Sequence, residues 1–294
     1  MSTSTKILAS LAVLTWAASA RADLAVVPRG PLYADSKGVP LKAPEGVGCS
    51  STALVVADTG NGRLVTFDWK DGSVSGGSEV KLQQVAYPVR VQLDSKGNML
   101  VLDRKAKRIA RLDAKGSFQA WVDPKGVTGV VPIAFKLDSA DHVYVVDVAG
   151  RTVLELDPSG TVARKLDVPK GAIFTDVATD AAGTLYAVDA AGGLVWSAEK
   201  GGTAFKPLSK SLKDMMSFPA YITTDGKGAL FVVDQNGMGL VLLGIDGSYL
   251  GRRLAIGWAD GTVYYPSQIC ITEAGEMVLA DRGNNRVQMF SVAH

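Results

Sequence analysis

The chain has 294 residues, 31 of them Lys or Arg and 29 Asp or Glu, which gives a formal net charge of +2 at pH 7. The first 22 residues hold two of the cations and none of the anions, so the rest of the chain carries equal numbers of both. This balance excludes the strongly basic proteins that bind nucleic acids through charge, and we expect no nucleic-acid partner.

Residues 1–22 have the pattern of a Sec-type export signal. Lys6 precedes the apolar stretch ILASLAVLTW (residues 7–16), and the small residues AASARA follow it. This order is typical of a secretory signal peptide, with cleavage after Ala20 or Ala22. No other apolar run approaches the roughly 18 residues that cross a bilayer. We therefore expect a mature chain of residues 23–294, without a transmembrane segment, in the periplasm or outside the cell.

After an isolated apolar run, LAVV (residues 24–27), the chain divides into six copies of one pattern. The string ADRGNNRVQMF (residues 280–290) resembles ADTGNGRLVTF (residues 57–67) and four weaker copies between them. The leading aspartates are 42 to 47 residues apart: Asp58, Asp103, Asp147, Asp189, Asp234 and Asp281. A second repeated position, usually proline, precedes each of these aspartates at a similar spacing: Pro44, Pro88, Pro132, Phe174, Pro219 and Pro266. A fixed period of this length is typical of repeat proteins.

Each copy contains short apolar runs of strand length. In the second copy these are VRVQLD (89–94), NMLVLD (98–103), RIARLD (108–113) and FQAWVD (118–123), with turn sequences such as DSKGN and DAKGS between them. Alternating or β-branched runs bounded by Asp and Gly predict antiparallel strands. Six units of four strands predict an all-β fold, a six-bladed β-propeller.

The sixth copy ends at residues 286–291 with only three strands. The run at residues 24–27 supplies the missing one. We therefore expect an N-terminal strand to complete the sixth blade and close the ring, because this covers an edge that would otherwise stay exposed.

The repeated order of elements resembles the NHL repeat. The order is a proline, a strand, a turn with Asp and Gly, a second strand, a loop of the form D-T/R-G-N-N/G-R, and a third strand. The resemblance extends over about residues 43–291 and is strongest in the first and sixth copies, whereas the fourth and fifth lack the loop arginine. The resemblance implies a six-bladed propeller that binds other molecules on one face. It implies no single activity, because fold and function separate readily.

Three copies carry an arginine five residues after the leading aspartate, at Arg63, Arg108 and Arg286. We expect these arginines to fold back onto their own turns or onto the neighbouring blade. Five further cations in the loops have no evident role in a turn and form what we call the basic arc: Arg104, Lys105, Lys107, Arg151 and Arg282. A one-sided arc of this kind steers acidic partners. Ordinary solvated surface charge is the alternative.

The third position of each inner strand is expected to face the central channel: Gly46, Arg90, Ala134, Asp176, Tyr221 and Gln268. One carboxylate is too few for a hard cation, so we expect no metal and no cofactor. The four polar residues Arg90, Asp176, Tyr221 and Gln268 would instead recognise a small polar ligand. A water-filled channel with the same side chains is the alternative.

Histidine content limits the chemistry. NHL-like amidating lyases hold their metal with several histidines, and this chain has only His142 and His294. A histidine-rich metal centre is therefore excluded. We expect His142 in a turn or on the surface.

The two cysteines, Cys49 and Cys270, fall in the inner strands of the first and sixth copies, which are neighbours in a closed ring. An exported protein meets conditions that favour disulfides. However, packed sheets lie about 10 Å apart, and a bridge needs Cβ atoms about 4 Å apart. We therefore expect two buried free thiols, and a disulfide between Cys49 and Cys270 is the alternative.

These patterns together predict an exported, non-enzymatic, monomeric propeller that serves as a binding or scaffold module. Its partner would be an envelope or extracellular protein, a glycan or another acidic ligand. Binding would use the basic arc and, at the channel mouth, Arg90. The alternative is a lactonase- or lyase-like hydrolytic propeller with a small-molecule site at the central channel.

Overall fold

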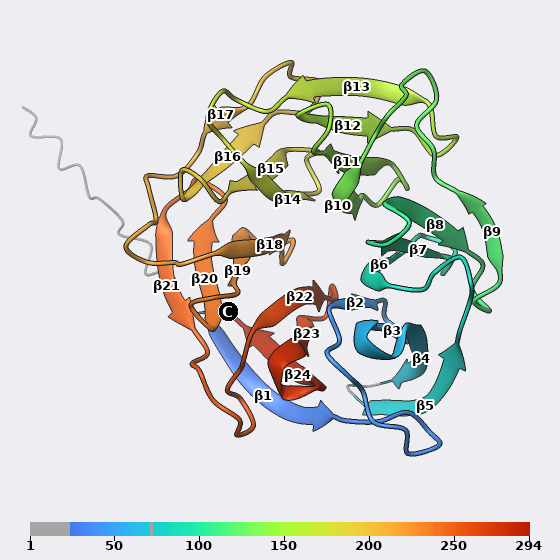
Figure 1. Ribbon diagram of the computed structural model, residues 1–294. Helices are drawn as coiled ribbons and strands as arrows, with labels where there is room; N and C mark the ends of the chain where they lie inside the picture. Colours follow the sequence, from blue (N-terminus) through green and yellow to red (C-terminus); the bar gives the residue numbers. More distant parts are fainter. Residues whose placement is uncertain (1–23, 71–72) are drawn as a thin grey trace, which may run out of the picture.

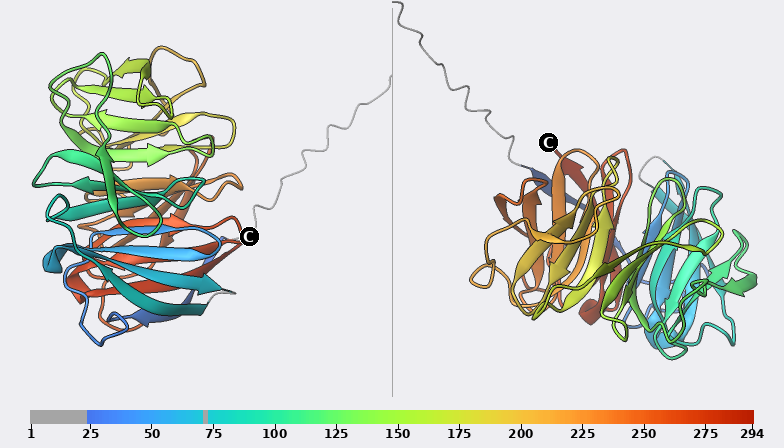
Figure 2. Two further views of the ribbon diagram at one scale, coloured as in Figure 1. Left: turned by 90° about the vertical axis from the view of Figure 1, so that its right-hand side faces the viewer. Right: turned by 90° about the horizontal axis from the view of Figure 1, so that it is seen from above.

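The computed structural model describes residues 24–70 and 73–294, so the expected signal peptide at residues 1–22 lies outside the described residues. These residues form a ring of six four-stranded antiparallel sheets around a central axis (Figure 1). In the side views the sheets stand next to one another, with turns on two opposite faces (Figure 2). The predicted six-bladed propeller is confirmed.

The strands of blades 1 to 3 are β2 (Gly46–Cys49), β3 (Ala53–Asp58), β4 (Arg63–Lys70) and β5 (Ser73–Val80), then β6 (Pro88–Leu93), β7 (Met99–Asp103), β8 (Arg108–Leu112) and β9 (Phe118–Trp121), then β10 (Pro132–Leu137), β11 (Val143–Asp147), β12 (Thr152–Leu156) and β13 (Val162–Asp167). Those of blades 4 to 6 are β14 (Phe174–Thr179), β15 (Leu185–Asp189), β16 (Leu194–Ala198) and β17 (Lys206–Pro207), then β18 (Pro219–Thr224), β19 (Ala229–Asp234), β20 (Gly239–Gly244) and β21 (Tyr249–Arg253), then β22 (Pro266–Ile271), β23 (Glu276–Asp281) and β24 (Arg286–Ala293). Among the described residues, no helix has the length and apolar character that a membrane crossing needs.

The N-terminal strand β1 (Ala25–Leu32) completes blade 6. It pairs antiparallel with β24, with Ala25 opposite Ala293 and Leu32 opposite Val287. Figure 1 shows β1, in blue, along the outer side of β24, in red. The expected ring closure is confirmed, and it pairs the outer edge of β24 with another strand.

The hydrophobic core lies between neighbouring blades. Phe231 of β19, for example, belongs to one buried cluster with Met277 and Phe290 of blade 6. Similar clusters join each of the other adjacent pairs of blades in the described part of the ring. Because the middle strands are covered on both faces, runs such as LVVAD in β3 are apolar almost throughout instead of strictly alternating.

The aspartate that opens each repeated loop is buried and anchors the chain just before the inner strand of its own blade. Asp103 Oδ2 accepts the Tyr87 N–H at 2.6 Å, and the Tyr87 carbonyl accepts the Arg104 N–H at 3.1 Å. The same two bonds recur at Asp147, Asp189 and Asp234. At Asp58 and Asp281 the second bond comes from the N–H two residues after the aspartate, that of Gly60 or Gly283. The repeated loop is therefore a structural clamp that satisfies buried main-chain groups.

The loop arginines follow the expectation in two of three copies. Arg63 and Arg286 are buried and donate to the aspartate of their own loop at 2.7 and 2.8 Å. Arg108 instead pairs with Asp123 beyond β9, where its guanidinium also lies 4.5 Å from the centroid of the Trp121 ring. The aromatic face of the outer strand offers this arginine a second contact that the loop does not.

Cys49 and Cys270 form a disulfide, so the expectation of two free thiols is wrong. Their Cα atoms are 5.9 Å apart, a separation that a disulfide spans. The 10 Å spacing of packed sheets holds away from the axis, whereas the inner strands of neighbouring blades converge around the channel. A Cβ added at Gly48, for instance, would lie 3.2 Å from the Gln92 Cα in the next blade. The bond joins blades 1 and 6, at the seam where the ring closes.

Candidate functional site

Antiparallel strands place successive turns on alternate faces of the ring. One face carries the turns between second and third strands, together with the clamped segments that lead into the inner strands. We call it the loop face. The turns between first and second strands lie on the opposite face. Each face has its own candidate site.

Exposed apolar side chains surround the channel on the loop face. The clamps fix the main chain of the residues that lead into the inner strands, and several of these residues are apolar. Ile173 is 57% exposed, and Val148, which follows the clamp aspartate of blade 3, is 49% exposed. With four further residues they form what we call the apolar collar: Tyr87, Ile133, Val148, Ile173, Phe218 and Tyr265. Grouped apolar exposure of this kind marks interaction surfaces.

The basic arc lies beside the collar on the loop face. Two of its arginines share one buried carboxylate, because Arg104 Nη2 lies 2.7 Å from Glu45 Oε2 and Arg282 Nε lies 3.5 Å from Glu45 Oε1. Arg104 also lies over the Tyr87 ring, at 5.6 Å from its centroid. These two arginines therefore neutralise a buried charge as well as facing solvent.

The remaining cations of the arc, Lys105, Lys107 and Arg151, are exposed. Lys107 and Arg151 have φ of 54° and 51°, at the left-handed position that ends each turn, and Arg151 donates to the Ala172 carbonyl at 3.2 Å. Lys105 and Lys107 have exposed side chains. Lys107 and Arg151 thus occupy a turn position that the sequence did not indicate, and Arg104 and Arg282 have a partner outside their own turns. Their main-chain geometry and their partners in other blades are not visible in the spacing of the residues.

A cleft of about 320 Å³ lies between blades 2 and 3, at the edge of the basic arc. Ile109, Val122, Val127 and Val130 are among its lining residues, as is Lys107. The cleft combines these apolar walls with the Arg108–Asp123 ion pair, and its apolar part fits an apolar side chain.

The channel residues that the sequence indicated come together in a buried layer. Arg90 reaches across the channel from β6, with Nη1 donating to Ser267 Oγ at 3.1 Å and Nη2 donating to the Ala220 carbonyl at 2.9 Å. Its guanidinium lies 5.2 Å from the centroid of the Tyr221 ring. Arg90 is therefore part of a layer that obstructs the channel, and it does not stand at an open mouth.

The other two residues of this layer bond to the main chain of the inner strands. Gln268 Oε1 accepts the N–H groups of Val47 and Val91 at 3.2 and 3.3 Å, and Nε2 donates to the Val91 carbonyl at 3.1 Å. Asp176 Oδ2 accepts the Ile222 N–H at 2.9 Å, whereas Oδ1 has no hydrogen-bond partner among the described residues. Gln268 thus ties blade 6 to blades 1 and 2.

Burial dominates the titration of these groups. It raises the pKa of Asp176 to about 7, although the charges of Arg90 and Lys136 and the Ile222 N–H act in the opposite direction. Burial also raises the pKa of the Tyr221 phenol and lowers the pKa of the Lys136 ammonium, which Asp176 partly counteracts. Charges in this region are poorly solvated and depend on one another.

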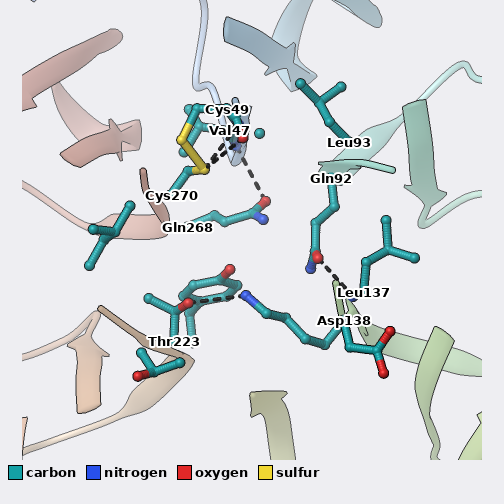
Figure 3. Close-up of a pocket in the computed structure, with 14 residues that line it drawn as sticks. Val47, Cys49, Gln92, Leu93, Leu137, Asp138, Thr223, Gln268 and Cys270 are labelled. Atoms are coloured by element: carbon teal, nitrogen blue, oxygen red, sulfur yellow. Dashed lines mark hydrogen bonds between the residues drawn. A yellow bond between two sulfur atoms is a disulfide. The ribbon is translucent and has the colours of Figure 1, made fainter. Parts of the chain in front are cut away.

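Sequence reasoning missed the next layer of the channel. Gln92, Lys136 and Thr223 line a cavity of about 190 Å³ on the face opposite the loop face (Figure 3). Lys136 Nζ donates to Thr223 Oγ1 at 3.0 Å. The strand alternation that indicated Arg90 and Tyr221 would have found these residues, because Gln92 and Thr223 follow two positions later on the same strands.

Both histidines pair with turn carboxylates on the face opposite the loop face. His142 Nδ1 lies 2.9 Å from Asp138 Oδ2, in the turn before β11, and His294 Nε2 lies 3.0 Å from Asp225 Oδ2. Within residues 24–70 and 73–294, no group of three or more His, Cys, Asp or Glu side chains is placed to hold a metal ion.

The chain is similar in structure to several solved propellers. They include virginiamycin B lyase from Staphylococcus aureus (TM-score 0.62, 15% identity, 92% of this chain and 88% of that chain). They also include a gluconolactonase from Xanthomonas campestris (TM-score 0.66, 15% identity, 92% and 97%) and a chain of the nidogen/laminin complex (TM-score 0.60, 16% identity, 78% and 92%). No protein-family model and no curated protein matches the sequence. At such low identity these similarities establish the propeller fold alone.

Proposed function

We propose that this chain is an exported propeller of the NHL type that binds an acidic envelope protein on its loop face. The observation that carries the proposal is the adjacency of the apolar collar and the basic arc on one face. Buried apolar area supplies affinity at a protein interface, and complementary charge steers the encounter and sets the orientation. The cleft between blades 2 and 3 adds a recess for an anchoring side chain.

Export and family assignment have separate support. Export rests on the sequence of residues 1–22, and the NHL assignment rests on the repeated loop whose aspartates form the clamps. A protein partner accords with the similarity to a chain of the nidogen/laminin complex. Hydrolysis or lyase chemistry at the channel is the alternative. We favour binding because the layer that contains Arg90 obstructs the channel from the loop-face side.

The test is charge reversal confined to one face. In the double variant Lys105→Glu/Lys107→Glu, both side chains are exposed, so the fold should persist, and Arg104 keeps its pairing with Glu45. The matched control is Lys96→Glu/Lys115→Glu, because these two exposed lysines lie in turns of the same blade on the opposite face. A third variant, Ile173→Asp, places a carboxylate in the apolar collar.

We expect the parent and the control to capture the same acidic protein from envelope extract at low salt, with capture weakening between 0.1 M and 1 M salt as screening increases. Both loop-face variants should lose that protein. If Lys105→Glu/Lys107→Glu and Ile173→Asp capture it as well as the parent does, the loop face is not the docking surface. Capture of a glycan in place of a protein would also contradict the proposal.

A further inference from the structure

A blind cavity enters the channel from the face opposite the loop face. Tyr221 and Gln268, from the layer that contains Arg90, are among its lining residues, and the ends of the inner strands β2, β6, β10, β18 and β22 surround it (Figure 3). Its volume of about 190 Å³ exceeds the roughly 30 Å³ that one water occupies in the liquid. It is smaller than the pockets of about 300–1,000 Å³ that take drug-sized ligands. This size fits a ligand of a few heavy atoms.

Lys136 is the cation that lines the cavity, and Asp138 is the carboxylate. Among the described residues, Lys136 forms no ion pair with Asp138 or with any other carboxylate. Arg90 and Asp176, which have opposite charges, lie in the layer behind the cavity and are not among its lining residues. An ammonium group without an ion pair is costly in a poorly solvated site, so Lys136 favours an added anion.

The carboxylate at the rim of the cavity already has partners. Asp138 at the rim accepts the Ala140 and His142 N–H groups, lies 2.9 Å from the His142 ring nitrogen, and accepts the Tyr144 hydroxyl. It therefore holds the turn on the rim together. Its contacts do not include Lys136.

Lys136 has donors to spare. An ammonium group carries three N–H donors, and among the described residues Lys136 Nζ has one hydrogen bond, to Thr223 Oγ1. The two glutamines of the wall have main-chain partners: Gln92 bonds to the Phe135 carbonyl and the Leu137 N–H, and Gln268 bridges to β2 and β6. The wall thus presents the Lys136 ammonium and the Thr223 hydroxyl, together with the Tyr221 ring and the Cys49–Cys270 disulfide.

We infer that this cavity is a binding site for a short monocarboxylate, whose carboxylate contacts Lys136 and Thr223. A carboxylate supplies the missing negative charge and accepts the remaining Lys136 donors in charge-assisted hydrogen bonds. A dianion would leave an excess of negative charge once Asp176 is ionised. The inference does not depend on the protein partner proposed for the loop face.

The test compares propionate with its neutral isostere propionamide. Affinities are measured by NMR titration of the full mature chain, at constant ionic strength, for the parent, Lys136→Met and the control Lys227→Met. Lys227 is exposed on the same face but does not line the cavity. We expect the parent and Lys227→Met to bind propionate equally, and propionamide to bind about tenfold or more weakly. Lys136→Met should weaken propionate binding by a similar factor.

The parent alone can already overturn the inference, because it needs no substituted chain to fold. Failure to bind propionate, equal affinity for propionamide, or equally effective competition by chloride would each do so. Circular dichroism and the thermal transition show whether Lys136→Met is folded. If it is not, Thr223→Val, which keeps the cation and removes one hydroxyl, should weaken propionate binding severalfold. A folded Lys136→Met or Thr223→Val with parental affinity would contradict the assigned contacts.

Discussion

Buried aspartates in this protein are of two kinds, which the hydrogen bonds of their oxygens distinguish. Asp281, at the clamp of blade 6, accepts the Tyr264 N–H and donors from three side chains. Asp176, in the channel layer, accepts the Ile222 N–H, and its other oxygen has no partner among the described residues. The first kind holds a loop together. The second leaves a carboxylate whose charged form is poorly satisfied.

The titration of Asp176 predicts a pH dependence of stability. Burial raises its pKa from 3.8 to about 7, so the folded protein keeps a proton that the unfolded chain releases near pH 4. The associated stability is full below about pH 4 and disappears as pH rises through about 7. Between pH 5 and pH 8 we therefore expect the free energy of unfolding, from urea titrations, to fall by about 2–3 kcal/mol more in the parent than in Asp176→Asn.

A control substitution separates this effect from the loss of any carboxylate. Asp167→Asn, at an exposed position at the end of β13, should keep the parental pH profile. Asp176→Asn removes the carboxylate that partly counteracts the lowered pKa of Lys136, so the comparison relies on the change with pH within each protein. Identical changes in the parent and in Asp176→Asn would show that Asp176 titrates as it does in water.

Two elements fasten the seam between the last blade and the first. On the outside, β1 pairs with β24 over seven registered positions, from Ala25 to Leu32. On the inside, the disulfide links β2 of blade 1 to β22 of blade 6. The two fasteners act at opposite edges of the sheets. Either one can therefore hold part of the seam while the other opens.

The disulfide between β2 and β22 should contribute measurably to stability. Replacing both cysteines, Cys49→Ser/Cys270→Ser, should lower the free energy of unfolding in urea by about 2–5 kcal/mol, because the unfolded chain loses a cross-link. Reductant should destabilise the parent to a similar extent and leave the double variant unchanged. Thiol titration of the denatured, unreduced parent should find no thiol. Two titratable thiols would contradict the bond.

Whether the sequence predicts a feature of this structure depends on how far apart in the chain the interacting residues are. Strands, blade number and clamp loops depend on neighbouring residues, and the missing strand of blade 6 indicates closure by the N-terminus. Pairings between blades, such as Arg104 with Glu45, depend on a convergence at the axis that spacing does not reveal. The exposure of Ile173 in the apolar collar is hard to predict from the sequence, because an apolar residue next to a strand looks like part of that strand. Lys136 could have been predicted from the strand alternation, because it lies two residues after the channel-facing position Ala134 on the same strand.

Closure of the whole ring predicts the behaviour of a chain that lacks β1. A truncated chain that begins at Tyr33 loses the partner of β24 and leaves an eight-residue strand as an open edge. Open edges recruit strands from other chains, so we expect association that increases with concentration in light scattering, where the parent has the mass of one chain. A peptide of residues 24–32 should restore the mass and thermal transition of the parent by adding back the strand, and a scrambled peptide of the same composition should not. A truncated chain that stays monomeric with the parental transition would show that the disulfide alone closes the ring.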